Sequence, residues 1–357
     1  MVVVMLTLSF VSCGIIKGDT VMEYGDYKVT EAMYSYWASS FKAYFLYYYG
    51  NSSNYSTLWS ETLPDGQTYG VFFENFLNSY AKKVLVCMRL YDEYSLSFPD
   101  ETRNEIEARL DDLKKTYGGK KELNAYLSSY GLNVSTLERI YYEEAKVDIV
   151  SDYLFASGGP NEITDTAREA YYNSNYYCVN WIYIYTEMKP EAGTDSNGNY
   201  NMVELTEAEK AEKAQLVSDI MTKLSAGESF AALKAQYCED KNEDGTSKYD
   251  YYPNGFNISG NSYSDGYGVE LIKQIQGMEI GSYSTYTDEY ATRIIVRNPL
   301  VKFFELTPQE YNFMVDFESY VKDEAMEELL ASIETTFNTG VAERYKVESV
   351  KTIDMSI

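Results

Sequence analysis

Any chemistry in this chain must depend on side chains other than histidine, because its 357 residues contain none. A Ser-His-Asp triad, a Cys-His pair and a His-ligated zinc site are therefore impossible. The acidic run Asp240 to Gly245 matches the first six positions of a calcium-binding loop, but Tyr251 stands at the twelfth, where the loop needs a bidentate glutamate. We expect a solvated acidic turn there, and neither a metal nor a cofactor.

The first cysteine ends an apolar run at the N-terminus. About a dozen residues are too few to span a bilayer, which takes about 20. The run resembles the signal peptide and lipobox of a bacterial lipoprotein with Cys13 as the acylated residue, although Phe10 stands where leucine is usual and no Lys or Arg precedes it. A start codon assigned too far downstream would explain the missing basic residues, and a buried N-terminal strand is the alternative. We expect a signal peptide over residues 1–13 and a lipid-anchored protein at the outer face of the cell membrane.

The other three cysteines have no motif spacing. Cys87, Cys178 and Cys238 are an odd number, lie far apart and each stand in an apolar context. This pattern predicts small buried side chains and no disulfide framework.

Composition and charge bound the class of protein and its partners. A hydrophobic fraction of 45% and a charged fraction of 24% are typical of globular proteins, and this length predicts two or three domains. The net charge of −25 disfavours binding to nucleic acid or to an anionic membrane surface, because both would repel the chain.

The middle of the chain contains five segments with recognisable local structure. Thr206 and Glu209 form a capping box at the start of one of the helices. In chain order we expect a buried strand at 178–185, helices at 206–224, 227–240 and 269–277, and a closing strand at 290–297.

This β-α-α-α-β order resembles the parvulin-type prolyl isomerases. The resemblance aligns the two histidines of the family with Trp181 and Arg293, and retains the family's acidic position at Asp240. The groove methionine and phenylalanine of the family fall on Tyr267 and Leu271, across a loop at 241–266 that is longer than usual. One of five groove positions is therefore kept.

Loss of the histidines argues against strong isomerase activity. The reaction is rotation about a bond with a barrier of about 18–20 kcal/mol, and no bond is made or broken. The histidines assist this rotation and are not nucleophiles, so a residual activity stays possible. Trp181 and Arg293 are expected to be a packed aromatic and a strand-edge cation, and Arg293 could pair with Asp240.

The flanking regions resemble the chaperone module of PrsA-type and SurA-type foldases. We expect a helix capped by Thr30, a helix capped by Asp100 that runs to Leu113, and a helix started by a capping box at Ser135. After the isomerase-like part, Thr307 and Pro308 start a helix, a second helical stretch reaches Phe337, and residues 345–350 form a strand-like tail. Residues 189–203 are a loop insertion with a turn at Asp195 to Gly198.

The chain contains 38 tyrosines, an unusual number. Tyrosine offers a large amphipathic face at low entropic cost. The runs Tyr44 to Tyr49 and Tyr34 to Trp37 could line a cradle for unfolded chains, or tyrosine could simply replace Phe and Leu on half-buried helix faces.

Together these patterns predict an α+β protein. A helical SurA-like chaperone domain would be built from residues 14–172 and 303–357, with a parvulin-like domain at 175–298 inserted. The expected function is that of an extracytoplasmic foldase that holds unfolded or newly secreted polypeptides, with a degenerate isomerase domain. A working isomerase with a remodelled groove and a non-catalytic adhesion lipoprotein are the alternatives, and a dimer is left open.

Overall fold

The structure, a computed structural model, describes residues 18–50, 55, 57–63, 66–194, 200–241, 252, 255–260, 267–314 and 316–354. The signal peptide predicted at residues 1–13 and the lipidated Cys13 lie outside the described residues. So do the turn at Asp195 to Gly198 and nearly all of the acidic run after Asp240. Mixed helices and antiparallel sheets confirm the predicted α+β class.

Contacts divide the chain into two compact units. The first unit combines Met1–Ile163 with Lys322–Ile357, and the second is Thr164–Val321. This division places 164–172 and 303–321 in the second unit. The boundaries predicted from sequence, at 172/175 and 298/303, stay a prediction.

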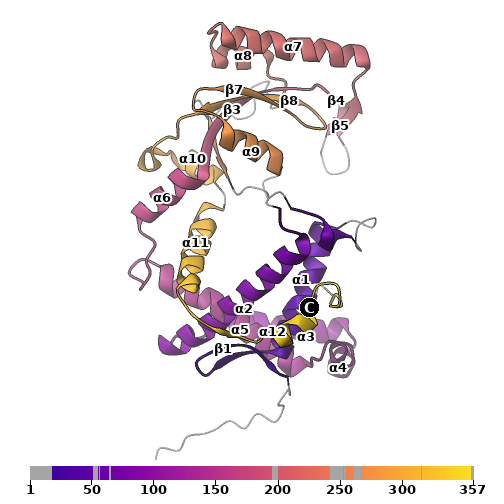
Figure 1. Cartoon of the computed structure of the whole chain (residues 1–357), viewed down its shortest axis with the longest axis vertical. Helices are drawn as coiled ribbons and strands as arrows, with labels where there is room; N and C mark the ends of the chain where they lie inside the picture. The colour runs from indigo at the N-terminus through magenta and orange to yellow at the C-terminus, as the bar shows by residue number, and fades with distance from the viewer. Residues whose placement is uncertain are drawn as a thin grey trace, which may run out of the picture. The chain divides into compact units, whose positions relative to one another are not determined.

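The first unit is mainly helical and is built from both ends of the chain (Figure 1). The N-terminal segment forms β1 (Thr20–Tyr24), β2 (Tyr27–Thr30), α1 (Glu31–Tyr48), η1 (Leu58–Ser60), α2 (Tyr69–Glu93), α3 (Asp100–Thr116), α4 (Lys120–Ser128) and α5 (Val134–Phe155). The C-terminal segment adds most of α11 (Phe317–Ala331), then β9 (Thr336–Phe337), α12 (Thr339–Ala342) and η3 (Glu343–Tyr345).

Two kinds of contact join these segments. β9 pairs antiparallel with β1 in a sheet of order β2-β1-β9, in which Met22 lies opposite Phe337. The Lys42 ammonium on α1 donates to the carbonyl oxygens of Val347 at 2.6 Å and Val350 at 2.8 Å. Each segment therefore satisfies backbone groups of the other.

Some helix starts in the first unit differ from the prediction. Thr30 caps α1, as predicted, by accepting from the Met33 amide. Asp100 is instead the first residue of α3, after Pro99, and α5 is capped by Asn133, whose Oδ1 accepts from the Thr136 amide at 3.0 Å. The capping box predicted at Ser135 is wrong because asparagine two residues earlier takes that role.

The C-terminal tail also differs. Phe337 belongs to a strand and not to a helix, and the described residues 345–350 form a 3₁₀ end and turns in place of a strand.

The second unit is an antiparallel sheet with helices on both faces (Figure 1). In chain order it contains α6 (Asp165–Asn175), β3 (Tyr176–Ile184), β4 (Met188–Thr194), β5 (Tyr200–Glu204), α7 (Glu207–Ser225), α8 (Phe230–Tyr237), β6 (Phe256–Ser259), α9 (Val269–Gly277), β7 (Tyr283–Thr287), β8 (Thr292–Asn298), η2 (Phe303–Glu305) and α10 (Pro308–Phe313). The strand order is β6-β3-β8-β7, and β4 and β5 form a separate hairpin. The capping boxes at Thr206 and Thr307 are confirmed.

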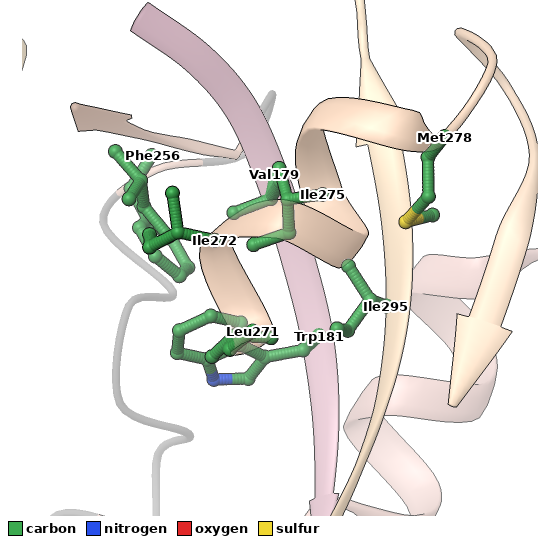
Figure 2. Packing of buried hydrophobic residues seen from close by; sticks show 9 residues of the cluster. Val179, Trp181, Phe256, Leu271, Ile272, Ile275, Met278 and Ile295 are labelled. Atoms are coloured by element: carbon green, nitrogen blue, oxygen red, sulfur yellow. The ribbon is translucent and has the colours of Figure 1, made fainter. Parts of the chain in front are cut away.

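Alternation along β3 sorts its side chains between two cores. Val179 and Trp181 face α9, together with Ile295 of β8. Ile182 and Ile184 face the other way, toward α7 and α8. Figure 2 shows the first of these cores, with the Trp181 indole beside Leu271 of α9. This strand period of two fixes which side chains can reach the groove predicted from the resemblance.

Candidate functional site

Four of the five predicted groove residues lie together on the α9 face of the sheet. Trp181 is 3% exposed, and its ring centroid lies 4.6 Å from that of Phe256 and 5.6 Å from that of Tyr267. Leu271 is fully buried in the same cluster. The Arg293 guanidinium carbon lies 5.4 Å from the Trp181 ring centroid. A large aromatic side chain therefore fills this place as part of the core, in agreement with the packed aromatic expected there.

Arg293 has a different acidic partner from the one predicted. Its guanidinium pairs with Asp288 and not with Asp240. The turn between β7 and β8 brings Asp288 back beside Arg293, and the Asp288 carboxylate also accepts the amides of Tyr290 at 2.8 Å and Ala291 at 2.9 Å. A local hairpin contact therefore takes precedence over a distant acidic residue.

The electrostatics of this pair follow from partial burial. Burial raises the pKa of Asp288, but the hydrogen bonds from Tyr290 and Arg293 outweigh that effect and the net pKa is lowered. The Arg293 guanidinium carbon lies 5.1 Å from the Tyr183 ring centroid, so the cation is stacked as well as paired. Its Nε is buried and has no hydrogen-bond partner among the described residues.

Asp240 lies after α8, half-buried, at the edge of this group. Burial first, and then the charges of Asp288 and Asp240, raise the pKa of Tyr183. The neighbouring Glu239 fixes the segment, because its amide donates to the Tyr183 carbonyl and its carboxylate accepts the Tyr185 amide, both at 2.8 Å. Asp240 and the Arg293–Asp288 ion pair thus both lie near Tyr183, and Arg293 pairs with Asp288.

Tyr183 and Asp288 were not predicted from the sequence as residues of this site. Tyr183 stands two residues after Trp181 in a strand, so the strand period alone places both on one face. Asp288 precedes the closing strand predicted at 290–297 by two residues, which is the position of a residue in the preceding turn. Both could have been found from the predicted strands.

A second candidate site is an exposed aromatic surface on the first unit. We define it as six side chains from the end of α1, the start of α2 and the chain between them: Tyr44, Tyr47, Tyr48, Tyr49, Tyr55 and Phe76, each between 41% and 68% exposed. The buried Phe45 beneath contacts Tyr44, Tyr49 and Phe76, with ring centroids 5.5 to 6.4 Å apart. Three of the six exposed rings therefore pack against a buried aromatic side chain.

The first tyrosine run has a different environment. Tyr34, Tyr36 and Trp37 are at most 4% exposed and belong to the core. Trp37 donates its indole N–H to the Glu144 carboxylate at 2.7 Å. Both interpretations of the tyrosines thus apply, one to each run: Tyr34 to Trp37 is interior and Tyr44 to Tyr49 is surface.

The chain around the aromatic surface carries no positive charge. Residues 43–81 contain no Lys or Arg and three acidic residues, Glu61, Asp65 and Glu74. The ammonium of Lys42, next to this stretch, is occupied by two backbone carbonyls, and burial lowers its pKa. The stretch of sequence that carries the aromatic surface is therefore negatively charged.

The described cysteines are not candidates for chemistry. Cys87, Cys178 and Cys238 are buried and form no disulfide with one another, as predicted. Burial raises the pKa of Cys87 and of Cys178 to about 12, which keeps both thiols neutral and poorly nucleophilic. Among the described residues, none of the helices is both long enough and apolar enough to span a bilayer.

Comparison with known proteins gives weak similarities. The chain matches no protein-family model and no curated protein. Solved structures that it resembles include PrsA from Bacillus subtilis (16% identity, 81% of this chain and 90% of that chain, TM-score 0.24). Others are the peptidylprolyl isomerase PrsA from Bacillus cereus (19%, 83% and 94%, TM-score 0.28) and the foldase protein PrsA from Streptococcus pneumoniae (14%, 83% and 96%, TM-score 0.24).

These structures bear the name of the foldases that the sequence resembles. Matches at such identities and TM-scores say nothing about activity, so the functional assignment depends on the side chains of the two candidate sites.

Proposed function

We propose that this protein is an extracytoplasmic foldase that acts mainly as a holdase for unfolded or newly secreted polypeptides. The observation that carries the proposal is the aromatic surface, whose six rings are exposed and of which three, Tyr44, Tyr49 and Phe76, contact the buried Phe45. Clusters of exposed apolar side chains are typical of an interaction site. Lipid attachment at Cys13 is part of the proposal and would hold the protein at the outer face of the cell membrane.

The mechanism is reversible burial of a client's apolar segments. Each Å² of apolar surface removed from water contributes about 25 cal/mol, and a tyrosine has few rotatable bonds to immobilise on binding. Such contacts are not specific for the amino-acid sequence of the client, so many clients can bind. Binding would compete with aggregation without a nucleotide cycle.

The parvulin-like unit contributes little isomerase activity in this proposal. The place of one family histidine is filled by the buried Trp181, and Arg293 is neutralised by Asp288. One observation favours the runner-up, a working isomerase with a remodelled groove. The buried Arg293 Nε is a donor without a partner among the described residues, and a peptide carbonyl could accept from it.

The holdase proposal is tested by aggregation of a chemically denatured client, followed by light scattering. The protein should suppress scattering, and Y47S/Y48S should lose most of this effect, since both rings are more than half exposed and little of the fold depends on them.

The matched control is Y153S. Tyr153 is 40% exposed and stacks on Tyr94, which follows the C-terminal end of α2, whereas the aromatic surface contains the start of α2. Suppression that survives in Y47S/Y48S and disappears in Y153S would refute the assignment.

A further inference from the structure

A cavity of about 600 Å³ lies in the second unit, at the edge of the sheet formed by β6. Neither Trp181 nor Arg293 lines it. We propose that this cavity binds a guanidinium group, as in an arginine side chain. The proposal does not depend on the holdase activity, which belongs to the other unit.

Four tyrosines line the cavity: Tyr176, Tyr252, Tyr267 and Tyr320. Tyr176 is 3% exposed and is fixed by stacking on Tyr172, with ring centroids 5.7 Å apart, and by an edge contact with Phe317 at 5.7 Å. Tyr267 is held against Trp181. At least two of the four rings are thus positioned before any ligand arrives. Aromatic faces attract cations, most strongly where water is excluded.

Asn257 supplies the second observation. It lies on β6 opposite Cys178, on the face of the strand away from the α9 core, and it lines the cavity. The residue is 7% exposed, and its Oδ1 has no hydrogen-bond partner among the described residues. Burial raises the pKa of the neighbouring Tyr172 and the Asn257 side chain acts against this shift, but the Tyr172 hydroxyl also has no hydrogen-bond partner among the described residues.

An unpaired buried acceptor is unfavourable, and in native proteins such groups are rare. A ligand that donates an N–H to Asn257 would remove this penalty. A quaternary ammonium has no N–H, so aromatic contact alone does not identify the ligand.

The charges of the residues that line the cavity indicate the charge of the ligand. The exposed Asp316 lies on the cavity wall, and no Lys or Arg is among its described lining residues. An anion would therefore meet a carboxylate and no positive side chain. A cation would meet one carboxylate, the Asn257 oxygen and the tyrosine rings.

Guanidinium fits this lining better than a lysine ammonium does. It is planar, so it can stack on a tyrosine ring, and it presents five donors in a fixed fork toward separate acceptors. It is also less strongly hydrated than an ammonium and enters a partly apolar cavity more readily.

The test is calorimetric titration of the whole protein with N-acetylarginine amide. Its matched probes are N-acetylcitrulline amide, which has the same shape without charge, and N-acetyllysine amide. We expect the arginine compound to bind about tenfold more tightly than either. Free guanidinium chloride at low concentration separates recognition of the head group from recognition of a peptide. If N-acetylarginine amide binds and guanidinium does not, the site is assigned to arginine within a polypeptide.

Two variants locate the site. D316N should weaken binding by about tenfold, whereas D219N, which changes the same charge on α7, should leave it unchanged. N257L should weaken binding and raise the melting temperature, because the unpaired acceptor is removed. Equal affinity for arginine and citrulline, or unchanged binding in D316N, would overturn the proposal even if N257L did not fold.

Discussion

At the scale of single residues, Glu144 is a buried carboxylate with a raised pKa outside the proposed sites. It lines a cavity of about 490 Å³ in the first unit and accepts hydrogen bonds from the Trp37 indole at 2.7 Å and the Tyr80 hydroxyl at 3.4 Å. Burial raises its pKa from 4.5 to about 7, although these two donors act against the shift. Between these values the folded protein keeps a proton that the unfolded chain has lost.

Stability should therefore fall as the pH rises from 4.5 to about 7, since the folded state binds more protons than the unfolded state over this range. The loss is at most ~3 kcal/mol, because one pKa unit corresponds to 1.36 kcal/mol. E144Q keeps an acceptor for Trp37 and Tyr80 and should remove most of this dependence. Urea unfolding at pH 5 and pH 8 measures the difference, with the exposed Glu122 changed to Gln as control. A pH dependence that persists in E144Q contradicts the assignment.

The groove residues lead to a prediction about catalysis. With both family histidines absent, we expect turnover of a proline peptide to be at least about a hundredfold below that of a histidine-containing parvulin, a loss of about 2.7 kcal/mol in transition-state stabilisation. A protease-coupled peptide assay measures this rate. Wild-type turnover near that of an ordinary parvulin would favour the remodelled-groove alternative.

The histidines can also be restored, in two steps. R293H can keep Asp288 as a partner, whereas W181H removes a buried ring and should destabilise the second unit by about 2–4 kcal/mol. We expect activity to rise in the double variant if the unit remains folded. Circular dichroism of both variants separates loss of fold from failure to restore catalysis.

At the scale of helices and strands, the elements predicted correctly from the sequence are those that local side-chain chemistry determines. Thr30, Thr206 and Thr307 cap helices because a hydroxyl oxygen can accept an orphan amide at a helix start. β3 was predicted from a long run of apolar and aromatic residues. The start of α5 was not, because Asn133 and Ser135 are both good caps and local preference alone does not choose between them.

The elements that were not predicted depend on pairing with segments that are distant in the sequence. β6 and β9 are short strands of four and two residues, and each exists because a neighbouring strand accepts its backbone hydrogen bonds. Such short segments carry no periodicity of their own. In the candidate site, Trp181, Tyr267, Leu271 and Arg293 were brought together as expected, whereas the Arg293 partner depended on the turn that precedes β8.

Lys42 provides the prediction for the C-terminal elements. Its ammonium donates to the carbonyls of Val347 and Val350, and K42M would leave both without this donor. We expect a loss of about 1–3 kcal/mol in stability, together with earlier cleavage of residues 339–354 in limited proteolysis. K121M, at an exposed position on α4, is the control. If residues 339–354 resist proteolysis equally well in both variants, the Lys42 contacts do not hold the C-terminal elements.

At the scale of the whole molecule, the first unit is one folded body made from two distant segments. Besides the β1–β9 pairing, Arg344 pairs with Asp19 and Glu31 at 3.0 Å, and Lys322 pairs with Asp152 at 3.1 Å. Exposed ion pairs of this kind are individually weak. Strand pairing and the Lys42 contacts add hydrogen bonds to backbone groups, which exposed ion pairs do not provide.

The last prediction concerns a shortened chain in which residues 18–163 are joined to 322–354 by a glycine-serine linker. The Lys322–Asp152 contact places the second segment close to the end of α5, so a short linker can reach it. We expect cooperative unfolding by calorimetry and suppression of client aggregation comparable to that of the full chain, because every residue of the aromatic surface is retained. Residues 164–321 alone should not protect clients. If that middle piece protects clients and the joined piece, although folded, does not, the aromatic surface is not the site of holdase activity.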